Sequence, residues 1–256
     1  MGDLLEKIKI RKVILIYIST MIFTFMILQM PFVKNIYLKN KYFGEFILNV
    51  LILIWVYIIF SKENISVKSE IIYLIKKVNY KKIVQLYILN LGIYIGIGLC
   101  IFIGDKSLIK VPSNIFIIFG ITLAPIVEEF IFRGVIMSRL KIRLGIIPAI
   151  FISSIIFGIV HFDFNIFGRL FFGILSALLY IQTKNIINCI IFHGLNNGSI
   201  FIFPIISQYT NFSINMDSEF KTNVLIFIIF SCFVLSVVLN IIYIKNNLPR
   251  KDSKLS

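Results

Sequence analysis

Long apolar segments separated by short polar connections run along almost the whole chain. A helix needs about 20 apolar residues to cross the hydrocarbon core of a bilayer, and most of these segments approach that length. The pattern therefore predicts an all-α integral membrane protein, a bundle of about eight transmembrane helices. The segment 170–183 is the weakest of the eight, because it is short and contains Gln182. The predicted spans are 13–33, 46–61, 86–104, 114–138, 146–162, 170–183, 186–207 and 223–244.

The composition agrees with a membrane protein, since 59% of the residues are hydrophobic and the mean hydropathy is +0.95. The net charge of +14 would by itself also suit a protein that binds nucleic acid. However, the predicted spans leave no soluble basic domain of the kind that binds DNA or RNA, so we expect no nucleic-acid partner. These patterns do not indicate an oligomeric state.

The lysines and arginines are unevenly distributed between the two sides of the predicted bundle. With the N-terminus inside, the inner segments carry 18 of them and the outer loops carry 7. This asymmetry predicts a multi-pass protein of the cell membrane with both termini in the cytoplasm. In the longest inner connection, 61–85, apolar residues alternate with lysines, which predicts a basic amphipathic helix on an anionic inner leaflet. Topology-setting lysines on an ordinary loop explain the same residues equally well.

Charged residues inside the apolar spans are the first candidates for a functional site. Glu128, Glu129 and Arg133 lie in the span 114–138, where each charge costs about 2.5–3.5 kcal/mol at the centre of a membrane helix. Glu129 and Arg133 are four residues apart and are therefore predicted to pair on one helix face. Glu128 points about 100° away from Glu129. We assign Glu128 as the chemical carboxylate and Glu129 as the structural one, and the opposite assignment remains open.

Both histidines of the chain also lie in predicted spans. His193 and Asn197 are four residues apart and share a helix face. With a rise of 1.5 Å per residue, Glu128, His161 and His193 lie roughly 18, 22 and 12 Å from the cytoplasmic side. The three side chains are therefore predicted to converge near the middle of the bilayer, as an intramembrane active site. Each of them taken alone also suits a structural polar contact between helices.

A carboxylate, two imidazoles and an amide can together hydrolyse a peptide bond. Glu128 could take a proton from water while His161 orients that water. His193 and Asn197 could donate hydrogen bonds to the developing oxyanion. Glu128, His161 and His193 also match a catalytic zinc ligand set, so zinc is a possible cofactor. We favour no metal, because the chain has no HExxH motif and the three ligands would come from three spans.

Three motifs occur in order along the chain: Glu128-Glu129-x-x-x-Arg133, Phe157-x-x-x-His161 and His193-x-x-x-Asn197. Together they resemble the CPBP family, also called the Abi or type II CAAX prenyl protease family, over about 115–200. The resemblance implies an eight-helix intramembrane glutamate-type protease, in which Glu128 activates water with help from His161. It implies that His193 and Asn197 hold the oxyanion. Members of this family have also been described as metalloproteases.

The resemblance further implies three parts of the chain. Residues 1–110 would supply N-terminal membrane helices with the basic amphipathic cytoplasmic segment, 111–207 the CPBP-like catalytic core, and 208–256 the last membrane helix and a cytoplasmic tail. Only the central part contains the three motifs. The two flanking parts are therefore expected to carry the surfaces that recognise a particular substrate.

We carry three functional hypotheses forward. The first is an intramembrane endopeptidase that cleaves a small membrane-associated peptide or protein, in bacteriocin immunity or peptide maturation. The resemblance implies prenylated substrates for eukaryotic relatives, whereas the richness of this chain in Ile, Lys and Asn is typical of bacteria with AT-rich genomes. A prenylated substrate therefore suits it less well. The second is a non-catalytic bacteriocin immunity or scaffold protein that uses the same residues as a structural polar core. The third is a proton-relay transporter, and the lack of an internal repeat weighs against it.

Overall fold

The computed structural model describes residues 10–40, 42–62, 66–104, 114–161, 166–210 and 219–249. These residues are almost entirely helical and include no β-strand. The elements are α2 (Ile10–Leu28), α3 (Pro31–Lys39), α4 (Tyr42–Lys62), α5 (Val67–Lys76), α6 (Tyr80–Gly104), α7 (Asn114–Glu129), η2 (Phe130–Met137), α8 (Ser138–Leu144), α9 (Ile146–Ile159), α10 (Ile166–Thr183), α11 (Ile186–Thr210) and α12 (Glu219–Asn247).

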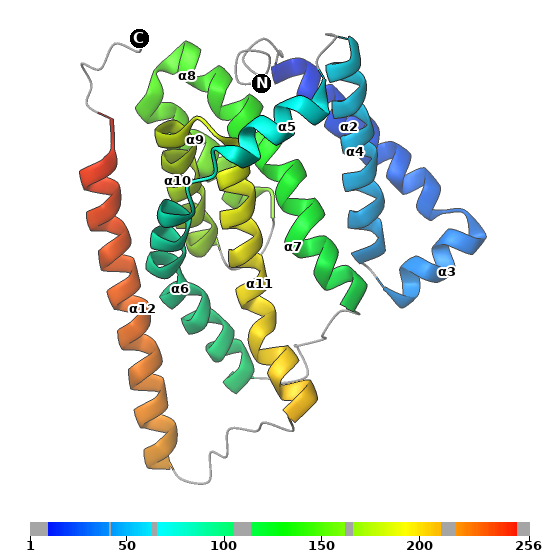
Figure 1. Cartoon of the computed structure of the whole chain (residues 1–256). Coiled ribbons are helices and arrows are strands. Elements are labelled where there is room, and N and C mark those ends of the chain that lie inside the picture. The colour runs from blue at the N-terminus through cyan, green and yellow to red at the C-terminus, as the bar shows by residue number, and fades with distance from the viewer. Residues whose placement is uncertain are drawn as a thin grey trace.

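The helices form one bundle whose core lies around α10. Figure 1 shows α2, α3 and α4 grouped on one side and α12 on the opposite side, with α7 and α11 between them. The main core packs residues of α6, η2, α9, α10 and α11, and Leu86, Ala149, Leu175 and Phe192 are fully buried in it. By contrast, α2, α4 and α12 expose many large apolar side chains. Such exposed apolar faces are typical of helices that contact lipid.

Each of the eight predicted spans overlaps at least one helix. Among the described residues, four helices are long and apolar enough to cross a membrane: 11–28, 42–62, 166–183 and 226–247. The protein is therefore an all-helical membrane protein, and the crossing of the bilayer by the other helices stays a prediction. The weakest predicted span, 170–183, is one of the four, because its helix begins earlier than expected, at Ile166.

Two predicted spans differ from the helices that the structure shows. The span 13–33 is wrong as a single helix, because α2 ends at Leu28 and Pro31 begins the separate helix α3. Proline lacks the N–H that a helix interior requires but fits the first turn of a new helix. The span 146–162 is also too long, since α9 ends at Ile159. His161 therefore lies in the turn after α9 rather than inside the helix.

A wide-turned π-helical segment, η2, follows α7 without a break. It begins immediately after the two glutamates and is continued by α8, so one unbroken helical rod runs over 114–144. The Ser138 hydroxyl donates a hydrogen bond to the Arg133 carbonyl five residues back (3.1 Å). Short π-helical segments inside α-helices occur frequently at functional sites. Here the segment carries Arg133, which pairs with Glu129.

The helix predicted within 61–85 is present as α5, which begins after Ser66. The Ser66 hydroxyl accepts a hydrogen bond from the Ser69 N–H, a typical N-terminal cap. Leu74 is buried while Ile72 and Ile75 are exposed. The Asn185 side-chain amide donates to the Leu74 carbonyl (2.8 Å) and so fastens α5 to the turn between α10 and α11. The contact of α5 with anionic lipid stays a prediction.

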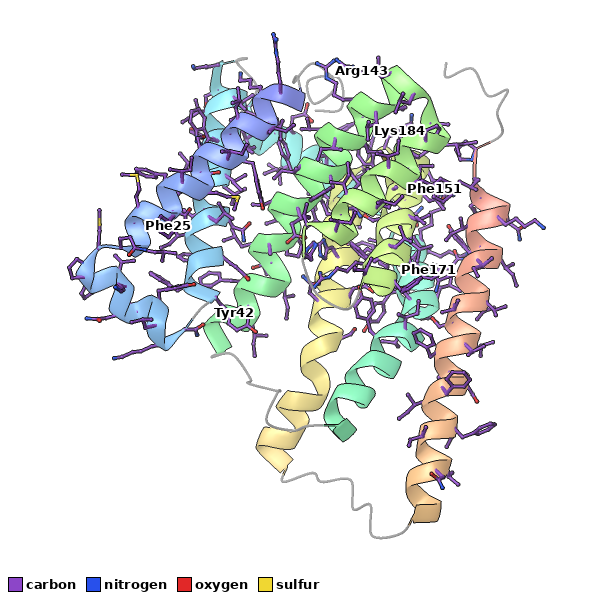
Figure 2. All side chains as sticks on the ribbon, turned by 180° about the vertical axis from the view of Figure 1, so that it is seen from behind. Phe25, Tyr42, Arg143, Phe151, Phe171 and Lys184 are labelled. Carbon is purple, nitrogen blue, oxygen red and sulfur yellow. The ribbon has the colours of Figure 1, made fainter. Side chains whose placement is uncertain are left out.

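One end of the bundle gathers basic residues. Arg143, in α8, and Lys184, in the turn after α10, lie at the same end in Figure 2. The first residues of α2 and the last residues of α12 lie at this end as well. The arrangement agrees with the charge asymmetry that the sequence shows. The side of the membrane that this end faces stays a prediction.

Candidate active site

The predicted site residues come from four neighbouring parts of the bundle. Glu128 and Glu129 end α7, and Arg133 lies in η2. His161 lies in the turn after α9, and His193 and Asn197 are on α11. Helix α7 packs against α11, and η2 packs against both α9 and α10. These contacts bring together residues that are up to 69 positions apart in the sequence.

Glu129 is the centre of a fully buried polar network. Its Oε1 lies 3.1 Å from Arg133 Nη1, and this confirms the ion pair predicted from their spacing. The same oxygen accepts a hydrogen bond from His193 Nδ1 (2.8 Å), and Oε2 accepts one from the Ser176 hydroxyl (2.7 Å). Arg133 Nη2 also donates to the Gly173 carbonyl (3.3 Å). Glu129 thus connects α7, η2, α10 and α11 without contacting solvent.

Glu128 faces the two histidines from the adjacent position. Its Oε2 lies 3.4 Å from His161 Nε2 and 3.8 Å from His193 Nε2. The predicted convergence of the three side chains is therefore confirmed. Glu128 and His161 are 24% and 20% exposed, while Glu129 and His193 are almost completely buried. The two glutamates thus occupy different environments, one at an accessible site and the other inside the protein.

The hydrogen bonds of the histidine rings determine which ring nitrogen faces Glu128. His161 Nδ1 lies 2.7 Å from the Phe157 carbonyl, and His193 Nδ1 lies 2.8 Å from the Glu129 carboxylate. A carbonyl and an ionised carboxylate only accept, so Nδ1 carries the hydrogen in each ring. Nε2 of each ring then faces Glu128, and it donates to the carboxylate whenever it carries a hydrogen. A proton can therefore be shared between Glu128 and either ring, so this geometry suits a group that takes up and passes on protons.

Two phenylalanine rings form an apolar wall behind the site. Phe157 contacts both histidine rings, tilted against His161 and edge-to-face with His193, at centroid distances of 4.7 and 5.7 Å. The Phe172 centroid lies 4.5 Å from that of His193. The Arg133 guanidinium lies over both phenylalanine rings, at 4.7 and 5.4 Å. These contacts restrict the orientation of the imidazoles and keep water away from the Glu129–Arg133 pair.

Among the described residues, no interaction joins Asn197 directly to Glu128. Its side-chain amide donates instead to the Gly120 carbonyl of α7 (2.9 Å). An asparagine amide has two hydrogens, so one is still available for another acceptor. The contact gives Asn197 a clear structural role in joining α11 to α7. Its predicted role at an oxyanion stays a prediction.

The possible zinc set Glu128, His161 and His193 is brought together around one carboxylate oxygen, Glu128 Oε2. However, no group of three His, Cys, Asp or Glu side chains among the described residues has an arrangement that could hold a metal ion. Glu129 holds His193 Nδ1, which leaves only Nε2 of that ring for any other contact. Metal dependence is therefore a question for experiment.

Sequence reasoning missed several residues of this region. Ser176, which donates to Glu129, is an ordinary small polar residue that no motif marks. Glu45 of α4 and Tyr17 of α2 both lie within electrostatic range of Glu128. Glu45 could have been found, because the charge argument that singled out Glu128 applies to it. It was overlooked because the predicted span began at 46, whereas α4 begins at Tyr42.

Comparison with known proteins agrees with this geometry. Residues 110–199 match the family described as type II CAAX prenyl endopeptidase Rce1-like. The match contains all three motifs and every predicted site residue. Residues 110–199 belong to the CPBP family. We refer to them below as the CPBP segment.

The chain also matches part of a curated protein. Over 105 residues the chain is 35% identical to the membrane-embedded CAAX protease MroQ of Staphylococcus aureus (strain USA300). The match covers 38% of this chain and 42% of MroQ, so the chain spans less than half the length of that relative. No solved structure matches the chain. The helices outside the CPBP segment are therefore interpreted from their own sequence and contacts.

Proposed function

We propose that this protein is an intramembrane endopeptidase that uses Glu128 to activate water. The observation that carries the proposal is the position of Glu128 Oε2 beside Nε2 of both histidines, at 3.4 and 3.8 Å. Each ring is held in this orientation by a hydrogen bond at its other nitrogen. The membership of residues 110–199 in the CPBP family supports peptidase chemistry over other uses of the same groups.

The proposed reaction begins with a water molecule that approaches the adjacent Glu128 and His161 side chains and donates a hydrogen bond to Glu128. Glu128 takes a proton from the water, and the water oxygen forms a bond to the carbonyl carbon of the substrate. The negative charge that develops on the carbonyl oxygen is stabilised by Nε2–H of protonated His193 and by the second amide hydrogen of Asn197. The C–N bond then breaks as the amine takes the proton from Glu128. Glu129 contributes by holding the ring of His193.

The proposed substrate is a small membrane-associated peptide or protein, with bacteriocin immunity or peptide maturation as the biological setting. MroQ is named a membrane-embedded CAAX protease, and the matched family is described by CAAX prenyl endopeptidases. The site supports a substrate that reaches it from the membrane, because it lies inside a bundle whose outer helices expose apolar faces. We further propose eight membrane crossings, both termini in the cytoplasm, and contact of α5 with the anionic leaflet.

Glu128→Gln tests the proposal directly, because glutamine keeps the size of the side chain but cannot take a proton from water. We expect cleavage to fall by about 100-fold or more, since general-base catalysis contributes about 10²–10⁴-fold. Wild type, Glu128→Gln and the distant control Glu70→Gln would be expressed in one host. Small membrane and secreted peptides would be compared by mass spectrometry, with and without a chelator.

The outcomes separate the hypotheses. A peptide produced by wild type and Glu70→Gln but not by Glu128→Gln would establish the protease and identify its substrate. Loss of that peptide with chelator would assign a metal to the reaction. If Glu128→Gln protected cells against a bacteriocin as well as wild type did and no peptide differed, the non-catalytic immunity protein would replace the protease.

A further inference from the structure

Tyr17 of α2 is a polar group beside Glu128 that lies outside the CPBP segment. It is within electrostatic range of Glu128 and, more weakly, of Glu45. Tyr17 and Glu128 are 38% and 24% exposed, whereas Glu129 is completely buried. Both Tyr17 and Glu128 are therefore open to a group that enters the site.

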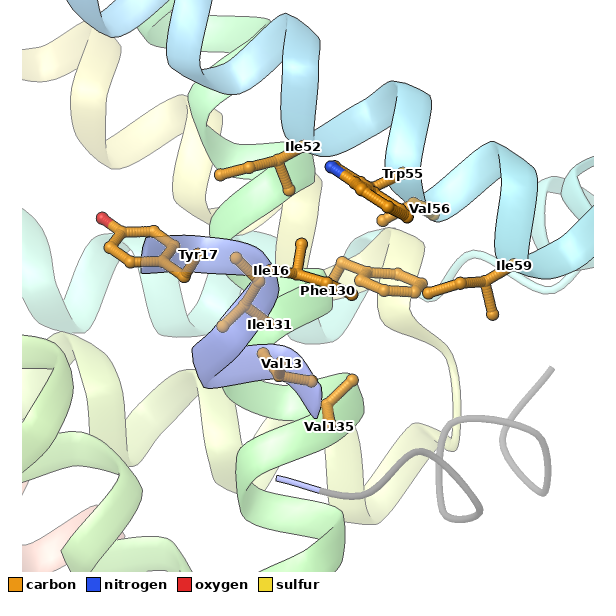
Figure 3. Close-up of a pocket in the computed structure, with 10 residues that line it drawn as sticks. All are labelled: Val13, Ile16, Tyr17, Ile52, Trp55, Val56, Ile59, Phe130, Ile131 and Val135. Carbon is orange, nitrogen blue, oxygen red and sulfur yellow. The ribbon is translucent and has the colours of Figure 1, made fainter. Parts of the chain in front are cut away.

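The phenol ring of Tyr17 is held among apolar side chains of α2, α4 and η2 (Figure 3). The free space among these side chains is only about 30 Å³, too small for a Leu or Phe side chain. Figure 3 shows the hydroxyl directed away from the other residues around this space. The packing thus leaves the ring little room to turn towards α4 and keeps the hydroxyl outside the apolar contacts.

The packing of α2 against η2 directs this hydroxyl towards Glu128. Val13 packs against the cluster that contains Val135, and Tyr17 follows Val13 by about one helical turn. Ile131, about one turn before Val135, lines the same pocket as Tyr17. Glu128 is three residues earlier again and lies on the same side of the rod as Ile131. The Tyr17 side chain therefore lies at the level of the rod that leads to Glu128.

The interaction between Tyr17 and Glu128 acts across a gap, because among the described residues no hydrogen bond joins the two side chains. His161 and His193, which face Glu128, come from the turn after α9 and from α11. Tyr17 comes instead from the group of α2, α3 and α4 on one side of the bundle (Figure 1). A peptide group bound at Glu128 would therefore have the histidines on one side and Tyr17 on the other.

We infer that Tyr17 is a further catalytic residue, which passes a proton from Glu128 to the nitrogen of the leaving amine. The inference rests on the proposed protease function and deepens its last step. As the C–N bond breaks, the Tyr17 hydroxyl gives its hydrogen to the nitrogen, and its oxygen takes the proton that Glu128 received from water. A phenol can do both, because it donates one hydrogen and has lone pairs that accept. The amine leaves neutral, and Tyr17 and Glu128 return to their starting states.

Tyr17→Phe tests the inference, because it removes the hydroxyl and keeps the ring that packs against α4 and η2. The first probe is a peptide that wild type is shown to cut. The second is the p-nitrophenyl ester of the N-terminal fragment of that peptide, whose leaving group departs without a proton. Tyr57→Phe is the matched control, since Tyr57 is a tyrosine of α4 with a 63% exposed side chain.

In Tyr17→Phe, kcat for the peptide should fall by about 100-fold or more, because general acid catalysis contributes about 10²–10⁴-fold. Hydrolysis of the ester should stay close to that of wild type, which also shows that the variant is folded. Tyr57→Phe should hydrolyse both probes as wild type does. Glu128→Gln should lose both activities, because both need activated water.

Two results would overturn the role of Tyr17 and leave the protease proposal intact. One is unchanged cleavage of the peptide by Tyr17→Phe. The other is an equal loss with peptide and ester, which would show that Tyr17 supports the structure or binds the substrate without protonating the amine. Cleavage of the peptide by Glu128→Gln would instead overturn the proposed protease mechanism, and the proton transfer through Tyr17 with it.

Discussion

At the scale of single residues, Glu128 and Glu129 differ in role because their surroundings differ. Glu129 is 0% exposed and contacts Arg133, His193 and Ser176, whereas Glu128 is 24% exposed and faces only the histidine rings in the contacts described. A buried charge needs partners because its desolvation is costly. The network of Glu129 therefore stabilises the fold. Among the described residues, Glu128 Oε2 has no hydrogen-bond partner, which leaves this oxygen for chemistry.

Glu129→Gln should therefore destabilise the protein strongly, by about 3–5 kcal/mol, because it leaves the charge of Arg133 buried without a counterion. Glu128→Gln should change the stability by much less than this. The measurement is the midpoint of thermal unfolding of both variants in the same detergent. Equal midpoints for the two variants would contradict the structural role assigned to Glu129.

At the scale of helices, the approach of α11 to α7 sets the distance between His193 and Glu128. Gly194 lies so close to α7 that an added Cβ would be 2.6 Å from the Ile121 carbonyl oxygen. One turn later, a Cβ on Gly198 would meet only the end of the Ile121 side chain, at 3.7 Å. Small residues that let helix backbones approach are common in membrane bundles. Only the first of these two glycines is required by the packing.

Gly194→Ala should push α11 away from α7 and reduce kcat/KM by about 100-fold, since a displacement of about 1 Å in an active site can have an effect of that size. Gly198→Ala, on the same helix and beside the same isoleucine, is the control and should retain activity. The test is cleavage of a peptide that wild type is known to cut. A similar loss in both variants would show that this spacing is not what matters.

Sequence patterns could predict most helices of the bundle but not their ends or neighbours. Hydrophobicity reports the length of an apolar segment, so it located the helices. It also extended the first predicted span beyond the end of α2 and across Pro31, where α3 begins. The spacing of Glu129 and Arg133 predicted their pairing because four residues make about one helical turn. The bond from Ser176 to Glu129 depends on how α10 packs against η2. No local spacing contains that information.

At the scale of the whole molecule, the basic residues and the ends of the outer helices gather at one end of the bundle. The start of α2, the end of α12, Arg143 and Lys184 all lie there (Figures 1 and 2). Tyr42, the first residue of α4, lies away from this end in Figure 2. Positively charged ends of membrane proteins face the cytoplasm. The bundle should therefore have one fixed orientation in the membrane.

Green fluorescent protein fused after Ser256 should be fluorescent, and alkaline phosphatase fused after Asn40 should be active, because the first reporter works in the cytoplasm and the second outside it. A phosphatase fusion after Lys184 should be inactive and serves as the control. Phosphatase activity after Lys184 but not after Asn40 would reverse the proposed orientation.

The Glu129 network also has a consequence for how the protein is made. During synthesis α7 emerges before α10 and α11, which supply Ser176 and His193. Until then Glu129 has only Arg133, on its own rod, as a partner within this network. A helix that carries such charges enters lipid reluctantly. Ser176 and His193 follow Glu129 by 47 and 64 residues. We therefore expect the rod 114–144 to enter the bilayer together with α10 and α11, in a collective insertion rather than helix by helix.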